Sequence, residues 1–189
     1  MNKLSYGLLS LLSTEPMSGY DLTTKINKFW RSTHSAIYPL LSELEEGNYI
    51  ELTLIEQTGK PDKKIYHLTD KGKELLRSWF ISETADEVCR DEMTLKLYCI
   101  NCMDEEAAET LLKEYEDRCN KRIEMYHKNL ARIKVLAQEN PDNAPASVFG
   151  SYIMTQRGLQ KTELDLKWCE WVRRIYKKKN LSFLKEDLR

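Results

Sequence analysis

The stretch HSAIYPLLSELEEGNYI, residues 34–50, decides the fold of the first part of this chain. Its apolar residues recur at i, i+3, i+4 and i+7, which is one face of a helix. These residues are Ile37, Leu40, Leu41 and Leu44. Pro39 interrupts the pattern, and a proline costs least near a helix N-terminus, where backbone amides lack intrahelical partners. We therefore expect a helix that is capped within residues 32–35, carries Pro39 at or just beyond its first turn, and ends at Gly47.

The opposite face of this helix begins with hydrogen-bonding side chains that core packing does not explain. These side chains are Thr33, His34, Ser35 and Tyr38. Small and aromatic polar groups at a helix N-terminus suit insertion into a DNA major groove. An ordinary solvated face explains these residues equally well when they are taken alone, so the neighbouring segments have to decide between the two interpretations.

The neighbouring segments predict a small domain around this helix. Leucines at helical spacing predict a helix over residues 2–13, and a second helix is expected over residues 21–30, with Phe29 and Trp30 on its apolar face. A period of two then predicts strands at residues 49–57 and 63–68.

A loop at residues 58–62 would join the two strands into a hairpin, and Thr69 is expected to cap a fourth helix. Three helices followed by a hairpin is the order of a winged helix-turn-helix. We assign residues 1–82 to such a DNA-binding domain.

The remaining residues, 83–189, predict long helices. A helix over residues 91–102 is expected to turn Met93, Leu97 and Ile100 inward, and Asp104 is expected to cap the next helix. Two near-heptad stripes follow, separated by the break ENPDNAP at residues 139–145. The first contains Leu111, Tyr115, Cys119, Ile123, Tyr126, Leu130, Ile133 and Ala137; the second contains Val148, Tyr152, Thr155, Leu159, Thr162, Leu166 and Cys169.

A short connection makes these two helices antiparallel neighbours. Two lone helices do not easily bury two long apolar stripes, so we expect a second copy of the chain to complete a bundle with two-fold symmetry. The alternative is that the stripes pack against the first domain. The residues predicted for dimerisation are Ile123, Tyr126, Leu130, Leu159 and Leu166. The predicted fold class is mainly α with a small β-hairpin: an N-terminal winged helix-turn-helix, then antiparallel long helices in a dimer bundle.

Charge is concentrated locally in a chain whose net charge is −1. Residues 1–80 contain ten basic and ten acidic residues, whereas residues 58–77 contain six basic and three acidic ones. Lys60, Lys63 and Lys64 fall at the hairpin tip and on its returning strand. Lysines at this place would contact phosphates, which position a protein on DNA without specifying sequence.

Four segments also resemble the PadR family of bacterial transcriptional regulators. They are LSYGLLSLL (4–12), MSGYDL (17–22), HSAIYPLLSELEEGNYI (34–50) and GKPDKKIYHLTDKGKELL (59–76), and together they cover about residues 1–80. By position, Ser35, Tyr38 and Pro39 match the recognition helix of the family. Lys63 and Lys64 match its basic wing, and Tyr20, after Gly19, matches its turn into the second helix. The two long C-terminal helices resemble the longer members.

The resemblance implies a homodimeric repressor that binds double-stranded DNA and releases it when an effector binds. A two-fold dimer predicts a pseudo-palindromic operator. Members of the family respond to phenolic acids or to hydrophobic drugs, or have no known effector. Aromatic residues beside a dimer interface could bind such a flat molecule, although each of them could equally fill the core. The effector candidates are Trp79, Tyr98, Tyr152 and Trp168.

Other functions have weaker support. Cys99 and Cys102 form a single C-x-x-C without the second pair that a structural zinc site needs, so no metal or cofactor is expected. No nucleophile motif, P-loop or dinucleotide fingerprint is present, which argues against an enzyme. With no signal peptide or membrane span, we expect a cytoplasmic protein with reduced thiols. The main rival is a winged-helix protein-interaction module without sequence-specific DNA binding, which the balanced charge of residues 1–80 favours.

Overall fold

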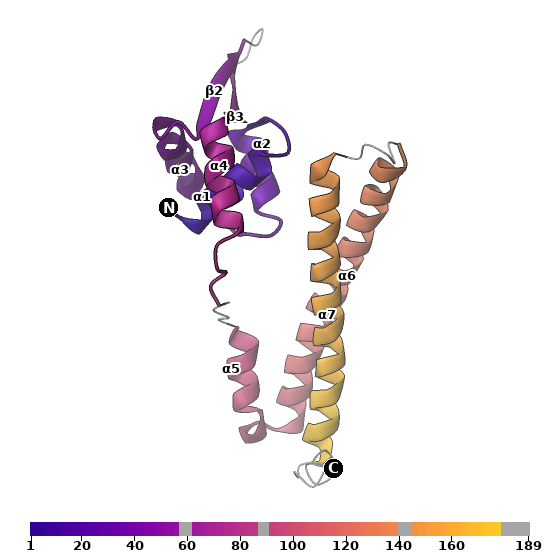
Figure 1. Cartoon of the computed structure of the whole chain (residues 1–189). Helices are drawn as coiled ribbons and strands as arrows, with labels where there is room; N and C mark the ends of the chain where they lie inside the picture. The colour runs from indigo at the N-terminus through magenta and orange to yellow at the C-terminus, as the bar shows by residue number, and fades with distance from the viewer. Residues whose placement is uncertain (57–61, 87–90, 140–144, 179–189) are drawn as a thin grey trace. The chain divides into compact units, whose positions relative to one another are not determined.

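The computed structural model describes residues 1–56, 62–86, 91–139 and 145–178. The chain divides into two compact units. The first is Met1–Asp86 with Pro145–Ser147, and the second is Glu87–Ala144 with Val148–Arg189. Helices dominate both units, and the only sheet among the described residues belongs to the first (Figure 1).

The first unit is a winged helix-turn-helix. Its elements are α1 (Lys3–Leu12), β1 (Met17–Ser18), α2 (Gly19–Ile26), α3 (His34–Glu46), β2 (Ile50–Ile55), β3 (Lys63–Leu68) and α4 (Asp70–Phe80). The strands form an antiparallel sheet in the order β1-β3-β2, in which Tyr66 of β3 lies opposite Met17 on one side and Leu52 on the other. The predicted hairpin is therefore part of a three-stranded sheet. The residues of β1 lie in the gap between the first two predicted helices, and a strand of two residues is too short to show a period of two in the sequence.

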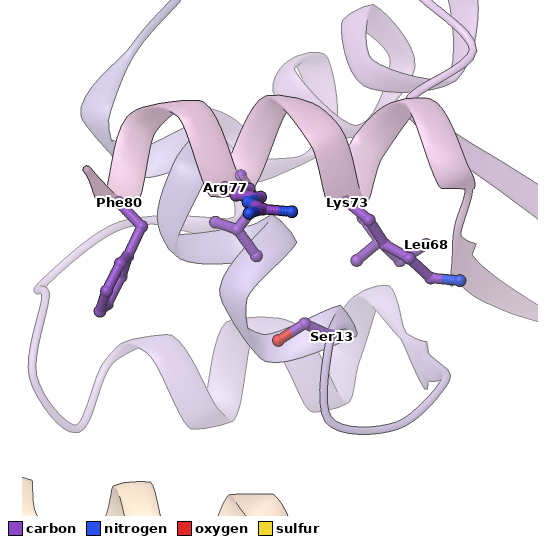
Figure 2. A pocket seen from close by; sticks show the side chains of 6 residues that line it. Ser13, Leu68, Lys73, Arg77 and Phe80 are labelled. Carbon is purple, nitrogen blue, oxygen red and sulfur yellow. The ribbon is translucent and has the colours of Figure 1, made fainter. Parts of the chain in front are cut away.

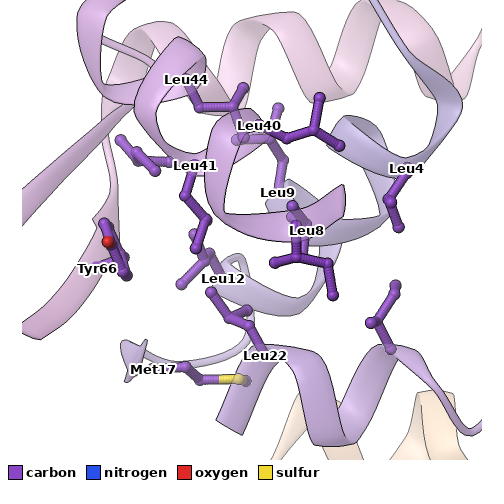
Figure 3. Packing of buried hydrophobic residues seen from close by; sticks show 13 residues of the cluster. Leu4, Leu8, Leu9, Leu12, Met17, Leu22, Leu40, Leu41, Leu44 and Tyr66 are labelled. Atoms are coloured by element: carbon purple, nitrogen blue, oxygen red, sulfur yellow. The ribbon is translucent and has the colours of Figure 1, made fainter. Parts of the chain in front are cut away.

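The core of the first unit confirms the predicted face of α3. Ile37, Leu40, Leu41 and Leu44 are 0%, 8%, 1% and 1% exposed. In Figure 3, Leu40, Leu41 and Leu44 of α3 lie close to Leu8, Leu9 and Leu12 of α1. Complete burial of one such side chain contributes about 1.5–3 kcal/mol. The buried cluster contains Leu4, Leu8, Leu9, Leu12, Met17, Leu22, Ile26, Ile37, Leu40, Leu41, Leu44, Ile50 and Tyr66.

The second helix differs from its prediction at both ends. It starts at Gly19, where the Ser18 side chain accepts a hydrogen bond from the amide of Asp21, and it stops at Ile26. Asn27 accounts for the stop, because its Nδ2 donates to the Thr23 carbonyl (2.8 Å) while its Oδ1 accepts from the Ser32 amide (2.8 Å).

The early stop of α2 changes the place of two aromatic residues. Phe29 and Trp30 were expected on the buried face of the helix, but they lie beyond its end and are 46% and 47% exposed.

The third helix ends at Gly47 as predicted, but Gly47 does not take the left-handed conformation that is common for a glycine after a helix. Gly47 is the C-terminal cap with φ −73°, whereas Asn48 takes the left-handed conformation with φ 56°. Asparagine tolerates that region better than most residues. Gly47 is needed for space instead, because a Cβ there would lie 2.6 Å from the Tyr49 ring.

The second unit contains α5 (Glu92–Tyr98), a 3₁₀ turn (Ile100–Cys102), α6 (Glu105–Glu139) and nearly all of α7 (Ala146–Lys178). The single helix predicted over residues 91–102 thus stops at Tyr98 and continues as the 3₁₀ turn. Met93 is buried as predicted, and Asp104 accepts a hydrogen bond from the Ala107 amide (2.8 Å) at the start of α6. Figure 1 shows α6 and α7 as long antiparallel helices.

Helices α6 and α7 pack tightly where Leu112, Tyr115 and Cys119 meet Cys169, and Met93 of α5 joins this cluster. Arg173 of α7 fixes the same end with a bidentate ion pair to Glu116 (2.7 and 2.8 Å) and a second pair to Glu109 (2.9 Å). The predicted stripes are buried or half-buried, except that Tyr152 is 45% exposed.

Two glycines in helices provide a test of the packing. Gly72→Ala should destabilise the protein by about 1–3 kcal/mol, the usual cost of overpacking, because its Cβ would lie 2.2 Å from the Tyr49 carbonyl oxygen. Gly150→Ala should be neutral or stabilising by up to about 1 kcal/mol, the difference in helix propensity, because nothing lies within 4 Å of its Cβ. Urea unfolding followed by circular dichroism measures both, and a similar midpoint for the two variants would contradict the close approach of α4 to Tyr49.

Candidate nucleic-acid interface

The N-terminus of α3 presents the predicted polar side chains to solvent. Thr33 is the N-cap, and its hydroxyl lies 2.9 Å from the hydroxyl of Ser35 instead of capping a backbone amide. His34, Ser35 and Tyr38 are the first, second and fifth residues of the helix, and all three are exposed. The buried leucines on the other side of α3 hold this face outward.

Pro39 is the sixth residue of α3 and is exposed. Because proline has no amide hydrogen, the Ser35 carbonyl cannot accept the usual bond from four residues further on. The apolar stripe continues past it, since Ile37 and Leu40 on either side are buried. The proline thus leaves the Ser35 carbonyl, near the exposed start of the helix, without its usual helical donor, and the core is not disturbed.

Three aromatic side chains form a row across α2 and α3. The His34 ring stacks with Tyr38 at 6.3 Å and with Tyr20 of α2 at 6.5 Å, measured between ring centroids. Tyr20 is 67% exposed and Tyr38 is 44% exposed. Gly19 makes room for this row, because a Cβ there would lie 3.0 Å from the Tyr38 ring and hydroxyl. The structure therefore brings Tyr20 of one predicted segment next to His34 and Tyr38 of another.

The first turn of α2 also contacts the wing. Lys63, at the start of β3, has its Nζ 3.7 Å from Asp21 Oδ2, and both side chains are 45% exposed. Lys64 follows and is exposed, opposite Leu54 of β2. Lys60 lies outside the described residues. Tyr20 and Asp21 thus join α3 to the basic strand, because one contacts His34 and the other contacts Lys63.

Asp21 contacts the basic strand, and it was not among the residues predicted for the DNA-binding site. The Ser18 hydroxyl donates to its Oδ2 (2.6 Å), and this bond is the main reason that the pKa of the carboxyl is lowered. The charges of Lys63 and Lys25 add to the effect. Asp21 is therefore a carboxylate that offsets part of the Lys63 charge. The capping-box spacing of Ser18 and Asp21 is the sequence signal that could have indicated it.

Not all of the basic cluster at residues 58–77 is available to a ligand. Lys71 donates to the Gly47 carbonyl (2.8 Å) at the end of α3, and Lys73 pairs with Asp70 (2.8 Å). In contrast, Lys28 and Arg31 are exposed in the connection between α2 and α3, and they were not among the predicted residues. Their position shortly before the predicted recognition helix is the sequence feature that could have indicated them.

The predicted effector residues are divided between the two units of the chain. Trp79 belongs to the first unit, where it stacks on Tyr6 at 4.8 Å. Tyr98 is 95% exposed at the end of α5. Tyr152 and Trp168 are 45% and 37% exposed, and they are sixteen positions apart, which corresponds to roughly 24 Å along α7.

Two shallow hollows lie elsewhere. One, of about 350 Å³, is lined by Ser13, Leu68, Lys73, Leu76, Arg77 and Phe80 (Figure 2). In Figure 2, Lys73, Arg77 and Phe80 all project from the same helix, α4. The other, of about 380 Å³, is lined by Glu170, Arg173, Arg174 and Lys177. None of the four predicted effector residues lines either hollow.

Tyr126 and Leu166, two of the residues predicted for dimerisation, contribute to the contact between α6 and α7 of a single chain. Tyr126 lies against Gly158, where a Cβ would be 2.6 Å from its ring, and Leu159 is only 7% exposed. Ile123, Leu130 and Leu166 are half-buried. The exposed apolar face of α7 is a different one. Its members recur at spacings of 4, 11, 4 and 3 residues, and they are Phe149, Ile153, Leu164, Trp168 and Trp171.

No three His, Cys, Asp or Glu side chains of the described part of the chain gather as metal ligands would. No described helix combines the length and the apolar character that crossing a membrane requires.

Comparison with known proteins agrees with this geometry. Residues 8–78 match the Transcriptional regulator PadR-like family, and residues 89–177 match the family Virulence activator alpha C-term. The negative transcriptional regulator PadR of Bacillus subtilis (strain 168) is 31% identical over 179 residues, which cover 90% of this chain and 95% of that relative.

Solved structures of the same relative are also similar. The crystal structure of Bacillus subtilis PadR in complex with operator DNA has a TM-score of 0.80 and 28% identity, covering 93% of this chain and 99% of that one. The complex of Bacillus subtilis PadR with p-coumaric acid has a TM-score of 0.73 and 28% identity, covering 92% and 98%. These relatives are regulators of transcription and not enzymes, as predicted for this chain. The chain therefore belongs to the PadR-like family of transcriptional regulators.

Proposed function

We propose that this protein is a homodimeric repressor that binds a pseudo-palindromic operator through residues 1–82 and responds to a small aromatic effector through residues 83–189, in the cytoplasm. The observation that carries the proposal is the continuous exposed surface formed by the start of α3, the first turn of α2 and the start of β3. Tyr20 stacks on His34, and Asp21 contacts Lys63. Recognition side chains and basic wing therefore belong to one surface.

Each part of this surface suits a different part of a DNA duplex. The start of α3 would enter the major groove, where Ser35, His34 and Tyr38 can contact base edges. Lys63 and Lys64, with Lys60 of the hairpin loop, would contact phosphates beside it. In a two-fold dimer the two copies of α3 would contact half-sites one helical turn, roughly 34–36 Å, or a multiple of it apart.

The similarity to Bacillus subtilis PadR supports the proposal in two respects. That relative is a negative regulator, and its structure is known in complex with operator DNA. The rival proposal, a winged domain that binds a protein instead of DNA, is supported by the balanced charge of residues 1–80 and by the Asp21 carboxylate beside Lys63. The two differ in salt dependence, because only phosphate contacts release counterions.

We also propose that dimerisation uses the exposed apolar face of α7. Large exposed apolar side chains on one helix face can mark an interaction site. On α7 they form two groups, Phe149 with Ile153 and Leu164 with Trp168 and Trp171. The other face of α7 already packs against α6. The half-buried Ile123, Tyr126 and Leu130 lie in the part of α6 that approaches the α6–α7 connection. A partner helix packed there would complete their burial. The equivalent packing of a second copy gives the two-fold symmetry that is usual for homodimers.

The effector proposal follows from the dimer. Tyr152 and Trp168 are too far apart along α7 to contact one small molecule within a single chain. A second α7 beside the first could bring an aromatic side chain of one protomer near that of the other. The complex of Bacillus subtilis PadR with p-coumaric acid supports an aromatic acid as the ligand class. Such a ligand would release DNA only if it bound the DNA-free arrangement more tightly.

Substitutions in the two parts of the DNA surface should have different effects. Lys64→Ala should weaken binding to operator and to random duplex alike and lower the salt slope by about 1, because it removes one phosphate contact. Tyr38→Ala should weaken operator binding by about 1–3 kcal/mol relative to random duplex, because it removes a base-edge contact. Fluorescence anisotropy over a series of salt concentrations measures both quantities.

Lys113→Ala is the matched control for these variants, because Lys113 is an exposed lysine of α6 outside the proposed surface. It should bind both duplexes like the parent protein. A parent protein whose duplex affinity does not change with salt would support the protein-interaction rival and contradict DNA binding.

A charge on the exposed face of α7 should disrupt the dimer. Leu164→Glu should shift the protein to monomers in sedimentation equilibrium, because Leu164 is 65% exposed in one chain and a partner would have to bury the new carboxylate. Leu95→Glu, at a residue of α5 that is 73% exposed, should remain dimeric. Circular dichroism should show that both variants keep their helices. A dimeric Leu164→Glu variant would exclude this face of α7 as the interface.

An aromatic acid should release the operator complex. Addition of p-coumaric acid should lower operator affinity several-fold, and Trp168→Leu should reduce that response because it removes an aromatic surface for the ligand. Lys113→Ala, at an exposed residue of α6 outside this face, is the control and should respond like the parent. If neither p-coumaric acid nor related hydroxycinnamic acids change the affinity or bind in calorimetry, this class of effector is wrong.

A further inference from the structure

The turn between α5 and α6 places two cysteines together. Cys99 follows the last residue of α5, and Cys102 ends the 3₁₀ turn. The Cys102 amide donates to the Cys99 carbonyl (2.9 Å), which closes the turn. In 3₁₀ geometry, residues i and i+3 lie one above the other with a rise of roughly 6 Å. That separation is within the range of about 4.4–6.8 Å between Cα atoms that disulfides require.

The described cysteines form two pairs with opposite environments. Cys99 and Cys102 are exposed, whereas Cys119 and Cys169 are completely buried between α6 and α7. Burial raises the pKa of the Cys119 thiol, and it raises that of Cys169 to about 11. Because the thiolate is the nucleophile, these buried thiols are poor reactants at neutral pH. The chain thus contains one accessible pair of cysteines and one buried pair, and the buried pair can serve as an unreactive control in the same molecule.

We propose that Cys99 and Cys102 are a redox-active dithiol that is converted to an intramolecular disulfide by exchange with a low-molecular-weight disulfide. Zinc is a weaker alternative, because a structural zinc site takes four ligands and no group of three or more metal-binding side chains is found in the described part of the chain. Two thiols one turn apart on an exposed turn supply everything that disulfide exchange needs.

The exchange takes place in two steps. One thiolate attacks a sulfur of the small disulfide, forms a mixed disulfide and displaces one small thiolate. The second cysteine of the pair then attacks the protein sulfur of the mixed disulfide and displaces the other small thiolate. In total the two cysteines lose two electrons and two protons, and the small disulfide is reduced to two thiols.

The geometry makes this disulfide a reversible one. It would close a ring of only four residues, and short loops gain the least stability from a cross-link. It would also fix the shape of a turn that is attached to α7, because the Tyr176 hydroxyl donates to the carbonyl of Met103, the next residue (2.8 Å). Oxidation would therefore act on the connection between α5 and the end of the α6–α7 pair.

The test uses full-length protein carrying Cys89→Ser, which leaves the four cysteines described above. Iodoacetamide should label Cys99 and Cys102 in the native protein, and Cys119 and Cys169 only after denaturation. After incubation with oxidised glutathione, the tryptic peptide of residues 97–113 should be unlabelled and lighter by two hydrogen atoms. Dithiothreitol should restore labelling at both positions.

Cys102→Ser is the variant that tests ring closure. Without the second thiol, the mixed disulfide should persist on Cys99 and be detected as a glutathione adduct of the same peptide. Cys119→Ser is the matched control and should form the Cys99–Cys102 disulfide like the parent. A stable glutathione adduct in the parent, or equal labelling of all four cysteines in the native protein, would overturn the proposal. Circular dichroism of each variant shows that the fold is retained.

Discussion

The burial of one face of α3 is the constraint on which the first unit depends. Four apolar side chains of this helix are almost completely buried against α1 and the other core elements, so the helix cannot rotate about its axis. With that face fixed, Thr33, His34, Ser35 and Tyr38 have to face solvent. An exposed row of polar and aromatic groups at a helix N-terminus is therefore a consequence of core packing and does not need separate stabilisation.

The first turn of α2 extends this constraint to the sheet. Ser18 caps the helix, Gly19 leaves room for the Tyr38 ring, Tyr20 stacks on His34, and Asp21 contacts Lys63. Four consecutive residues thus determine how the start of α3 lies relative to the basic strand. Each of these four residues has a different partner. The short segment therefore connects both the start of α3 and the start of β3 to α2.

Elements with a long apolar period could be predicted from the sequence, and elements defined by single contacts could not. The buried face of α3 and the stripes of α6 and α7 were evident because each repeats over several turns. The end of α2 depends on two hydrogen bonds of Asn27, and β1 is only two residues long, so neither produces a period.

The candidate site shows the same division. His34 and Tyr38 were predicted, because they belong to the pattern of α3. The Asp21–Lys63 pair joins residues 42 positions apart in the sequence, so only the folded chain shows it. The second, exposed apolar face of α7 also could not be predicted from the sequence. Its residues show no regular period, because eleven positions separate Ile153 from Leu164.

The Arg173 clamp has a mechanical consequence. Its guanidinium bonds to Glu116 and Glu109, which are two turns apart on α6, while the apolar cluster packs beside it. Sliding α7 along α6 by a single turn would break the present contacts of Arg173 with Glu116 and Glu109. The ion pairs therefore fix the register of the two helices at this end. A movement of this end would tilt α6 and α7 together as one rigid pair.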